Sequence, residues 1–367
     1  MKTMELLPKR VTYYKANLHC HTVFSDGKMT PEEIKRHYQE KGYQVIAFTD
    51  HDRYVDHREL SDGEFLAITA LETDINQAVD MSWNYRRTWH MNWYDTCPDQ
   101  NKEIKEALCR PEVPYEDMDA VNAYVEEMTK LGFIGCYNHP YWSLQTCDEY
   151  TKLKGMWGME IYNHGCEMDG LYGYHPQAYD EMLRSGQKLF CVSTDDNHNS
   201  MAIDGGLYDS FGGYVMIGAE SLTYDGIIDA LKKGNFYSCC VPDGQGEAPE
   251  ILEFTRTGSH VHVKCTPADK IFLKTMGRNC HRASARPGET ITEADFELNG
   301  EEGYIRVEIT DGKGRHTNAV YGFLNILFKV IDEEQPDFLT VAFDVRKKTF
   351  RHEMFAEYKG TRKPMPE

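Results

Sequence analysis

Histidines and carboxylates in this chain recur in short motifs that follow apolar, strand-like runs. The first motif is Asn17-Leu-His-Cys-His21, which places His19 and His21 directly after such a run. Residues at i and i+2 of an extended segment point to the same side, so both imidazoles can reach one point in space. Comparable motifs follow over the next two hundred residues and contain Asp26, His51, Glu72, His90, His139, Asp196 and His198.

Metal binding is the chemistry that these residue types favour. Imidazole and carboxylate groups are ligands for zinc, iron, manganese and similar ions. Several carboxylates placed close together repel one another unless bound cations compensate their charge. A lone histidine at a strand end is more often a capping or core residue, but nine residues of ligand type at successive strand ends predict a metal site.

The elements that position these residues alternate between strand and helix. Short apolar runs typical of buried parallel strands occupy residues 13–18, 45–49, 65–71, 133–137, 159–162, 189–193 and 214–218. Helices are predicted at residues 118–131, 176–185 and 224–233, the last closed by Gly234. Another helix begins at Pro31 after a Thr30–Glu33 capping box and ends near Gly42. This alternation indicates an α/β barrel or a doubly wound sheet. In a barrel the carboxyl ends of the strands meet on one face, so all nine candidate ligands are expected in one cleft.

The pattern of the sequence changes near Val241. Residues 241–249 are rich in turn formers and are predicted to be a linker. Short alternating segments follow at 251–255, 260–265, 271–274 and 304–310, which favours a small antiparallel β domain. We therefore expect two domains, 1–240 and 241–367. The charged, amphipathic tail from about residue 324 fits neither pattern.

Composition narrows the classes of protein. The 367 residues include 40 Lys and Arg against 59 Asp and Glu, a formal net charge of −19. Such a charge argues against non-specific binding to nucleic acid or to anionic membranes. No run approaches the roughly 20 apolar residues of a membrane span, and residues 1–14 lack the apolar core of a secretory signal. Eleven cysteines without a CxxC pair are expected to be reduced and mostly buried, so the expected location is cytoplasmic.

The motifs also resemble a known family. Asn17–Gly27, Thr30-Pro-Glu-Glu33 and Ile46–Asp52 resemble the opening of a PHP (polymerase and histidinol phosphatase) domain. The resemblance covers about residues 13–237 and continues through Glu72, His90, Asn138-His-Pro140, Glu160-Ile-Tyr-Asn163 and Asp196-Asn-His198. The residues around His90 depart from the usual aliphatic ones. Gly312–Tyr321 is similar to the last strand of a small β domain that follows the PHP domain in many stand-alone members.

This resemblance implies an α/β fold with a distorted (β/α)7 TIM-like barrel, a second, smaller antiparallel β domain, and two to three divalent ions (Zn, Fe or Mn). It assigns the first metal to His19, His21, Glu72 and Asp196, the second to Glu72, His90 and His139, and the third to Asp26, His51 and His198. Some members have a histidine in the place of Asp26, so this chain has the aspartate variant. Glu160 resembles a residue that supports the site from behind.

The expected function is metal-dependent hydrolysis of a phosphate mono- or diester of a small metabolite or short nucleotide. Ions that share a water lower its pKa from 15.7 towards about 7, and the same ions neutralise charge on phosphate oxygens. Two alternatives stay open: hydrolysis of a C–N or lactone bond on the same site, as in amidohydrolases, and a non-catalytic, metal-stabilised binding protein. The acidic chain has no polymerase-sized region, which disfavours a polymerase-linked exonuclease and a stable nucleic-acid complex. The oligomeric state is open.

Other residues could assist the reaction. Candidates for protonating the leaving group, from loop position alone, are Asp50, Asp52, His164 and His175. Arg86 and Arg87 precede His90 and could bind phosphate, with Lys28 and Arg53 nearby. Aromatic residues could wall the cleft, although core packing is their commoner use: Trp83, Tyr85, Trp89, Trp93, Tyr94, Tyr141 and Trp142.

Overall fold

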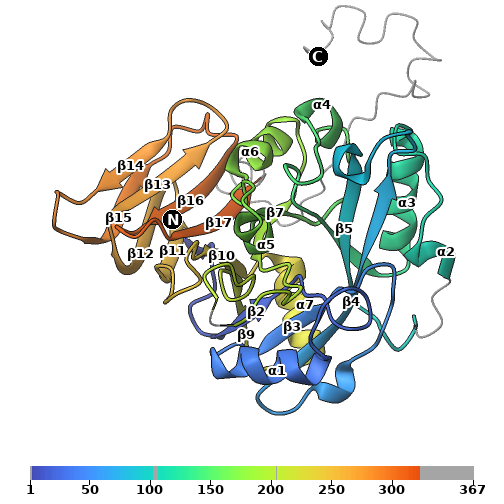
Figure 1. Cartoon of the computed structure of the whole chain (residues 1–367). Coiled ribbons are helices and arrows are strands. Elements are labelled where there is room, and N and C mark those ends of the chain that lie inside the picture. Colours follow the sequence, from blue (N-terminus) through green and yellow to red (C-terminus); the bar gives the residue numbers. More distant parts are fainter. Residues whose placement is uncertain (1, 102–105, 204, 323–367) are drawn as a thin grey trace, which may run out of the picture. The chain divides into compact units, whose positions relative to one another are not determined.

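Thirteen strands form one continuous sheet in the computed structural model, which describes residues 2–101, 106–203 and 205–322. The strand order is β14-β13-β16-β17-β10-β9-β2-β3-β4-β5-β6-β7-β8. The part from β10 to β8 carries the helices, and the part from β14 to β17 is antiparallel (Figure 1). An α/β region and a separate antiparallel β region, both predicted from the sequence, are therefore confirmed.

The α/β part contains all seven predicted strands. They are β2 (Thr12–Asn17), β3 (Val45–Phe48), β4 (Leu66–Asn76), β6 (Phe133–Tyr137), β7 (Gly158–Asn163), β8 (Phe190–Thr194) and β9 (Gly213–Ala219). Parallel pairing joins β2 to β3 and β3 to β4, and again β6 to β7 and β7 to β8. The last predicted strand, β9, runs antiparallel to β2.

Two strands of this part were not predicted. β5 (Thr88–Asp95) lies antiparallel between β4 and β6, and β10 (Phe236–Cys240) pairs with β9. All eight residues of β5 are buried although the strand mixes His90 and Asn92 with tryptophan and tyrosine. An apolar run is therefore absent from the sequence of β5, and this strand delivers His90 to the site.

The two ends of the α/β part approach each other beyond β2 and β8. A parallel bridge joins Cys20 to Asn197, with backbone hydrogen bonds from His21 N to Asn197 O (3.1 Å) and from Asp196 N to His19 O (3.0 Å). These bonds set His19 and His21 beside Asp196. Within the described residues the ladder itself is not closed between β8 and β2, so the closed barrel stays a prediction.

Helices form where local sequence signals predicted them. α1 (Pro31–Glu40) begins with both halves of the Thr30–Glu33 capping box, and Gly42 just beyond it has φ +79°. α7 (Tyr224–Lys233) is capped by Gly234 in the left-handed conformation. The other helices are α2 (Glu106–Cys109), α3 (Met118–Lys130), α4 (Cys147–Tyr150), α5 (His164–Met168) and α6 (Pro176–Arg184), with 3-10 turns at Arg58–Leu60 and Trp83–Tyr85.

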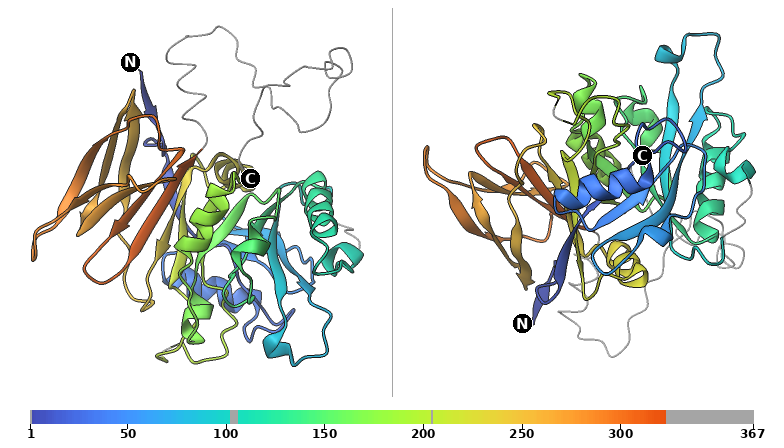
Figure 2. Two further views of the ribbon diagram at one scale, coloured as in Figure 1. Left: turned by 90° about the horizontal axis from the view of Figure 1, so that it is seen from above. Right: turned by 60° about the horizontal axis from the view of Figure 1, so that its bottom comes forward.

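The antiparallel region has two layers of strands, without helices among its described residues (Figure 2). β13 (Lys270–Thr275), β14 (His281–Ser284), β16 (Tyr304–Thr310) and β17 (His316–Gly322) extend the large sheet. β1 (Thr3–Glu5), β11 (Ile251–Thr257), β12 (His260–Ala268) and β15 (Ile291–Glu297) form a second sheet in the order β1-β11-β12-β15. β1, β14 and β15 were not predicted.

Contacts cross the expected domain boundary at Val241. β10, which precedes it, pairs with β17 after it, and β1 pairs with β11. The division into 1–240 and 241–367 therefore stays a prediction. The tail from about residue 324 lies outside the described residues, and among those described no helix is long and apolar enough to cross a bilayer.

A buried arginine ties the antiparallel region to α6. The Arg306 side chain on β16 is 1% exposed and forms ion pairs with Asp180 Oδ2 on α6 and Glu308 Oε2, both at 2.9 Å. Asn318 Oδ1 on β17 accepts a further hydrogen bond from Arg306 at 2.7 Å. Helix α6 thus meets the distant strands β16 and β17 at one buried charge.

Candidate metal centre

The strand ends bring all nine candidate ligands around one cavity of about 630 Å³. Seven of them line it: Asp26, His51, Glu72, His90, His139, Asp196 and His198. His19 and His21 lie behind this wall and are fully buried. Every one of the nine residues lies within 4 Å of another member of the group.

Glu72 on β4 stands at the centre of the group. Its Oε2 atom lies 3.1–3.4 Å from ring nitrogens of three histidines, His19, His21 and His51. Its Oε1 atom lies 3.0 Å from His90 Nδ1 and 3.5 Å from His139 Nε2. Burial opposes ionisation of Glu72, but the surrounding imidazoles, His19 foremost, hold its pKa well below the usual range. Glu72 is therefore a carboxylate suited to bridging two ions.

The first ligand group has the four residues assigned from the sequence. Ligand atoms of His19, His21, Glu72 and Asp196 all lie within 4.8 Å of one another. The Nε2 atoms of His19 and His21 are 3.1 Å apart, and both approach Asp196 Oδ1, at 3.1 and 3.0 Å. Two imidazole nitrogens and two carboxylates that all face one point are the donor set of a divalent ion.

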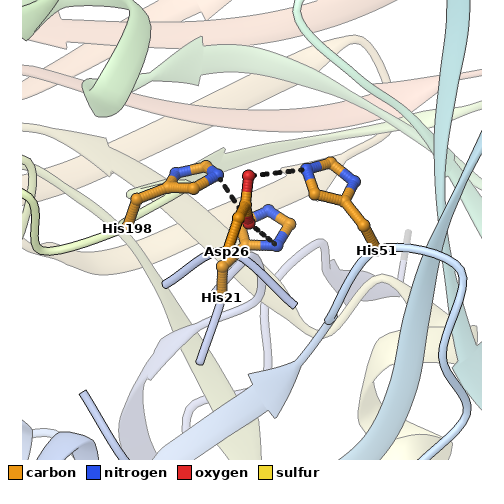
Figure 3. Close-up of side chains that lie close together, drawn as sticks. All are labelled: His21, Asp26, His51 and His198. Atoms are coloured by element: carbon orange, nitrogen blue, oxygen red, sulfur yellow. Dashed lines mark ion pairs between the residues drawn. The ribbon is translucent and has the colours of Figure 1, made fainter. Parts of the chain in front are cut away.

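The third group has one more member than expected. Asp26, His51 and His198 are joined by His21, which reaches this group through Nδ1 (Figure 3). Asp26 lies 3.3 Å from His198 Nε2 and 3.9 Å from both His51 Nε2 and His21 Nδ1. The His21 ring stacks against the rings of both His51 and His198, with 4.3 and 4.2 Å between ring centroids. His21 therefore faces two groups, one with each ring nitrogen.

The second group differs from the predicted set. His51, Glu72 and His90 have ligand atoms within 4.8 Å of one another, whereas His139 approaches only to 3.5 Å from Glu72 Oε1. His90 Nε2 is buried without a hydrogen-bond partner among the described residues. A buried imidazole nitrogen without a partner is costly unless it serves as a ligand. This group therefore fits an ion held by Glu72 and His90.

Further side chains hold the ligands in place. Glu160 is fully buried and its Oε1 atom accepts from His19 Nδ1 at 2.6 Å, while its Oε2 atom accepts from His139 N at 3.1 Å. This agrees with the supporting position expected for Glu160. Asn138 donates to Glu72 Oε1 at 2.6 Å, and Asn163 donates to Asp196 Oδ2 at 3.0 Å. Such partners orient metal ligands.

The supporting roles of Asp195 and Asn138 had no assignment from the sequence. Asp195 accepts hydrogen bonds from Tyr38 and from the backbone amides of three successive residues, 211–213, which fixes the loop carrying Asp196. Burial raises the pKa of Asp195 to about 7. Asn138 belongs to a motif noted in the sequence, but its position beside a histidine gives no sign of its contact with Glu72, 66 residues earlier.

The candidates for protonating the leaving group lie outside the cavity lining. Asp50 is buried and accepts from Thr22 N, Thr22 Oγ1 and Ser25 Oγ at 2.7–2.8 Å, so it fixes the loop that carries Asp26. Asp52 packs near Asp74 and Arg110, and burial together with Asp74 raises the pKa of Asp52 to about 7. Neither aspartate lines the cavity.

The two histidine candidates are buried in the core as well. His164 Nδ1 lies 2.9 Å from the Tyr162 hydroxyl, and His175 immediately precedes α6. Burial lowers the pKa of each to about 4, so both are neutral near pH 7. Neither lines the cavity, and the structure does not bring them to the ligands.

The two arginines predicted to bind phosphate contact other residues of the chain. Arg86 Nε donates to Met81 O at 3.0 Å, and Arg87 forms an ion pair with Glu149 at 3.2 Å. Neither lines the cavity, whereas Lys28 does. Of the aromatic candidates, Trp83 and Trp142 line it; Trp89, Trp93 and Tyr94 are fully buried in the core.

Ligand groups of this kind, at strand ends of an α/β sheet, define a metal-dependent hydrolase. The chain belongs to the PHP domain family, whose sequence profile matches residues 17–203, a little more than half of its length. A solved structure similar to this chain is described as a two-domain protein containing a "predicted PHP-like metal-dependent phosphoesterase" from Bacteroides vulgatus. It is 20% identical, with a TM-score of 0.42, over 86% of this chain and 97% of that one.

The end of the chain matches a different family. Residues 302–367 match the profile described as "5'-3' exonuclease, N-terminal resolvase-like domain". The chain is 59% identical over 54 residues to DNA polymerase I of Geobacillus stearothermophilus, and 44% identical over 59 residues to the 5'-3' exonuclease of Aquifex aeolicus. These segments are 15% and 16% of this chain but span only 6% and 20% of the relatives. The profile match includes β16 and β17 and continues beyond the described residues.

Proposed function

We propose that this protein hydrolyses a phosphate mono- or diester of a small metabolite or short nucleotide. The observation that carries the proposal is the convergence of three ligand groups around Glu72, with ligand atoms within 4.8 Å of one another in each. The adjoining cavity of about 630 Å³ has the size of a small-molecule site. Bound divalent ions would supply the Lewis acidity that activates water and neutralises phosphate charge.

The ligand groups would hold two to three divalent ions (Zn, Fe or Mn). His19, His21, Glu72 and Asp196 would hold the first ion, and His21 with Asp26, His51 and His198 the third. The second would be held by Glu72 and His90, with His51 or His139 beside them. His21, His51 and Glu72 each belong to two of these groups.

The chain's own residues fix the geometry of the reaction. Glu160 accepts a hydrogen bond from His19 Nδ1, which leaves His19 Nε2 free to face the first group. Asn138 and Asn163 hold the carboxylates of Glu72 and Asp196. Trp142 packs against the rings of His90 and His139, at 5.0 and 5.1 Å between ring centroids, and keeps water from that side.

Hydrolysis of a C–N or lactone bond is the alternative on the same ligands. One preparation, purified without chelator, should be assayed with an aryl phosphate, an aryl phosphodiester, an aryl amide and an aryl lactone. We expect chelator-sensitive turnover of a phosphate ester. Turnover of the amide or lactone alone would favour the alternative, and metal without turnover of any probe would favour the non-catalytic binding protein.

Three further features complete the proposal. The Cys20–Asn197 bridge supports closure of the strands into a (β/α)7 barrel. The free state of all eleven cysteines supports a cytoplasmic location. The turn-rich residues 241–249 support a PHP domain over 1–240 and a β domain with its tail over 241–367.

Action on nucleic acid is a second candidate. It is favoured by the match of residues 302–367 to an exonuclease domain, against which stands the net charge of −19. Fluorescence anisotropy with a labelled duplex carrying a 5' flap tests it on the full chain. Saturable binding that weakens with salt would support this candidate, and the absence of binding at micromolar protein would support small-molecule substrates alone.

A further inference from the structure

The cavity wall beyond the nine ligands is acidic. Asp74, Asp169 and Asp209 line it, with Lys28 as the one lysine or arginine in the described lining. The Lys28 ammonium is itself held by Asp26 O at 3.0 Å. A phosphate bound away from the metal ligands would therefore face carboxylates, and like charges placed side by side repel.

The carboxylates of the three acidic residues differ in their hydrogen-bond partners. Asp209 accepts from the backbone amides of His198 and Asn199, at 2.7 and 2.9 Å, and Asp74 accepts from Asn76. Asp169, directly after α5, has no hydrogen bond or ion pair from its side chain to any described residue. Asp169 lines the cavity and is exposed. Its carboxylate is a free acceptor beside the site.

The side formed by the 3-10 turn Trp83–Tyr85 and the loop after β6 is aromatic. Trp142 covers His90 and His139, and Trp83 packs edge-on to Trp142 with 6.5 Å between ring centroids. Trp83 is 48% exposed and lines the cavity, so a face of its ring is open to a ligand. Planar rings bind well against such an indole.

We infer that the substrate carries its phosphate only at the metal ligands, stacks a planar ring on Trp83, and donates a hydroxyl or ammonium hydrogen bond to Asp169. On this assignment Asp169 is a specificity-determining residue that disfavours a second phosphate. The inference rests on the proposed function and narrows its substrates to singly phosphorylated compounds with a ring, of the nucleoside monophosphate kind.

Three probes separate these contributions on the full-length protein purified without chelator. Adenosine 5'-monophosphate has the ring and one phosphate, adenosine 3',5'-bisphosphate adds a second phosphate, and ribose 5-phosphate lacks the ring. Both kcat/KM for phosphate release and the calorimetric Kd are measured for each. The variants are Asp169→Asn and Trp83→Leu. Asp229→Asn removes an equal charge from exposed α7, and Tyr85→Leu removes an exposed ring from the same 3-10 turn outside the cavity lining.

We expect the wild type to favour the monophosphate over the bisphosphate at least about tenfold. Asp169→Asn reduces that ratio at least threefold and Asp229→Asn does not. Trp83→Leu reduces the preference for the monophosphate over ribose 5-phosphate, and Tyr85→Leu does not. Equal handling of mono- and bisphosphate by the wild type, or equal effects of a variant and its control, would overturn the inference.

Failure of the proposed function would give results that differ from failure of this inference. Binding of these probes without turnover removes phosphoester hydrolysis of these compounds, and the Kd ratios alone then decide the inference by the same criteria. If adenosine 5'-monophosphate neither binds nor is hydrolysed, the assigned substrate class is wrong, while turnover of the aryl esters would still uphold the phosphoesterase.

Discussion

Glu72 is the residue on which the account depends most. It contacts five histidines, and its carboxylate is shared by all groups except the one centred on Asp26. Its charge is held by imidazoles rather than by lysine or arginine. Divalent ions held by neutral imidazoles would compensate this buried carboxylate, and they account best for so many ligands around it.

Glu160 gives the first prediction at this scale. Glu160→Gln replaces the charged acceptor of His19 Nδ1 by an amide of equal shape. Because such partners orient metal ligands and raise their basicity, we expect metal affinity to fall roughly 10–100-fold with the fold retained. Titration of the metal-free protein, followed by elemental analysis and circular dichroism, measures both. Glu126→Gln, on exposed α3, is the matched control. An unchanged affinity in Glu160→Gln would remove its supporting role.

The types of the ligands could be predicted from the sequence, but not all of their partners. His19 and His21 share a side because extended residues alternate, which is a local rule. That His21 also faces Asp26 through Nδ1 depends on the position of the loop held by Asp50. Contacts of this kind form between segments distant in the chain, and local spacing does not encode them.

Elements with strong local signals were predicted well. α1 has its Pro31 start and capping box, and β6 has the predicted bounds. β5 was missed because its site-facing residues are polar and its other face is aromatic, which gives no apolar run. β5 forms a strand because it pairs with β4 on one side and β6 on the other. These pairings join segments distant in the sequence, so local patterns do not predict them.

The capping box of α1 gives a prediction at the scale of the element. Thr30→Ala removes the acceptor for Glu33 N, so the free energy of unfolding should fall by about 1 kcal/mol. Urea denaturation followed by circular dichroism measures it. Thr30→Ser keeps a hydroxyl acceptor and should stay within a few tenths of a kcal/mol of wild type. Equal losses in both variants would exclude the cap as the cause.

At the scale of the whole molecule, a variant of Arg306 tests whether this side chain holds the antiparallel region to α6. Arg306→Met leaves Asp180 and Glu308 without their shared partner in a buried place. Breaking a buried ion pair in this way costs about 3–5 kcal/mol. We expect this loss in the free energy of unfolding by chemical denaturation. Arg278→Met, on the exposed turn after β13, should change stability little. A loss below about 1 kcal/mol in Arg306→Met would contradict the anchoring role.

The same contact predicts a pH dependence. Burial alone would raise the pKa of Glu308, but Arg306 and Lys274 outweigh it and hold the pKa below the usual 4.5. A carboxyl with a lowered folded pKa stabilises the protein above its unfolded pKa and loses that contribution as pH falls. The stability advantage of wild type over Glu308→Gln should therefore be constant near pH 7 and shrink below about pH 4.5. An advantage that grows on acidification would contradict this assignment.

The two family matches divide the chain unequally. The PHP match carries the candidate metal centre, while the exonuclease match begins at residue 302 and includes β17, which pairs with β10 of the α/β part. Within the same stretch, Gly312–Tyr321 resembles the last strand of a β domain that follows the PHP domain. β17, which this segment forms, pairs with β16 and agrees with such a last strand. The exonuclease match had no counterpart in the motifs considered, and it makes nucleic acid a partner worth testing.

The most direct test of the central claim is the metal content of the wild type and of Glu72→Gln, purified without chelator and measured by elemental analysis. The account predicts two to three ions per wild-type chain and the loss of at least one in Glu72→Gln, with the circular dichroism spectrum retained. A fully folded wild type that carries no metal and cannot be reconstituted with Zn, Fe or Mn would contradict it.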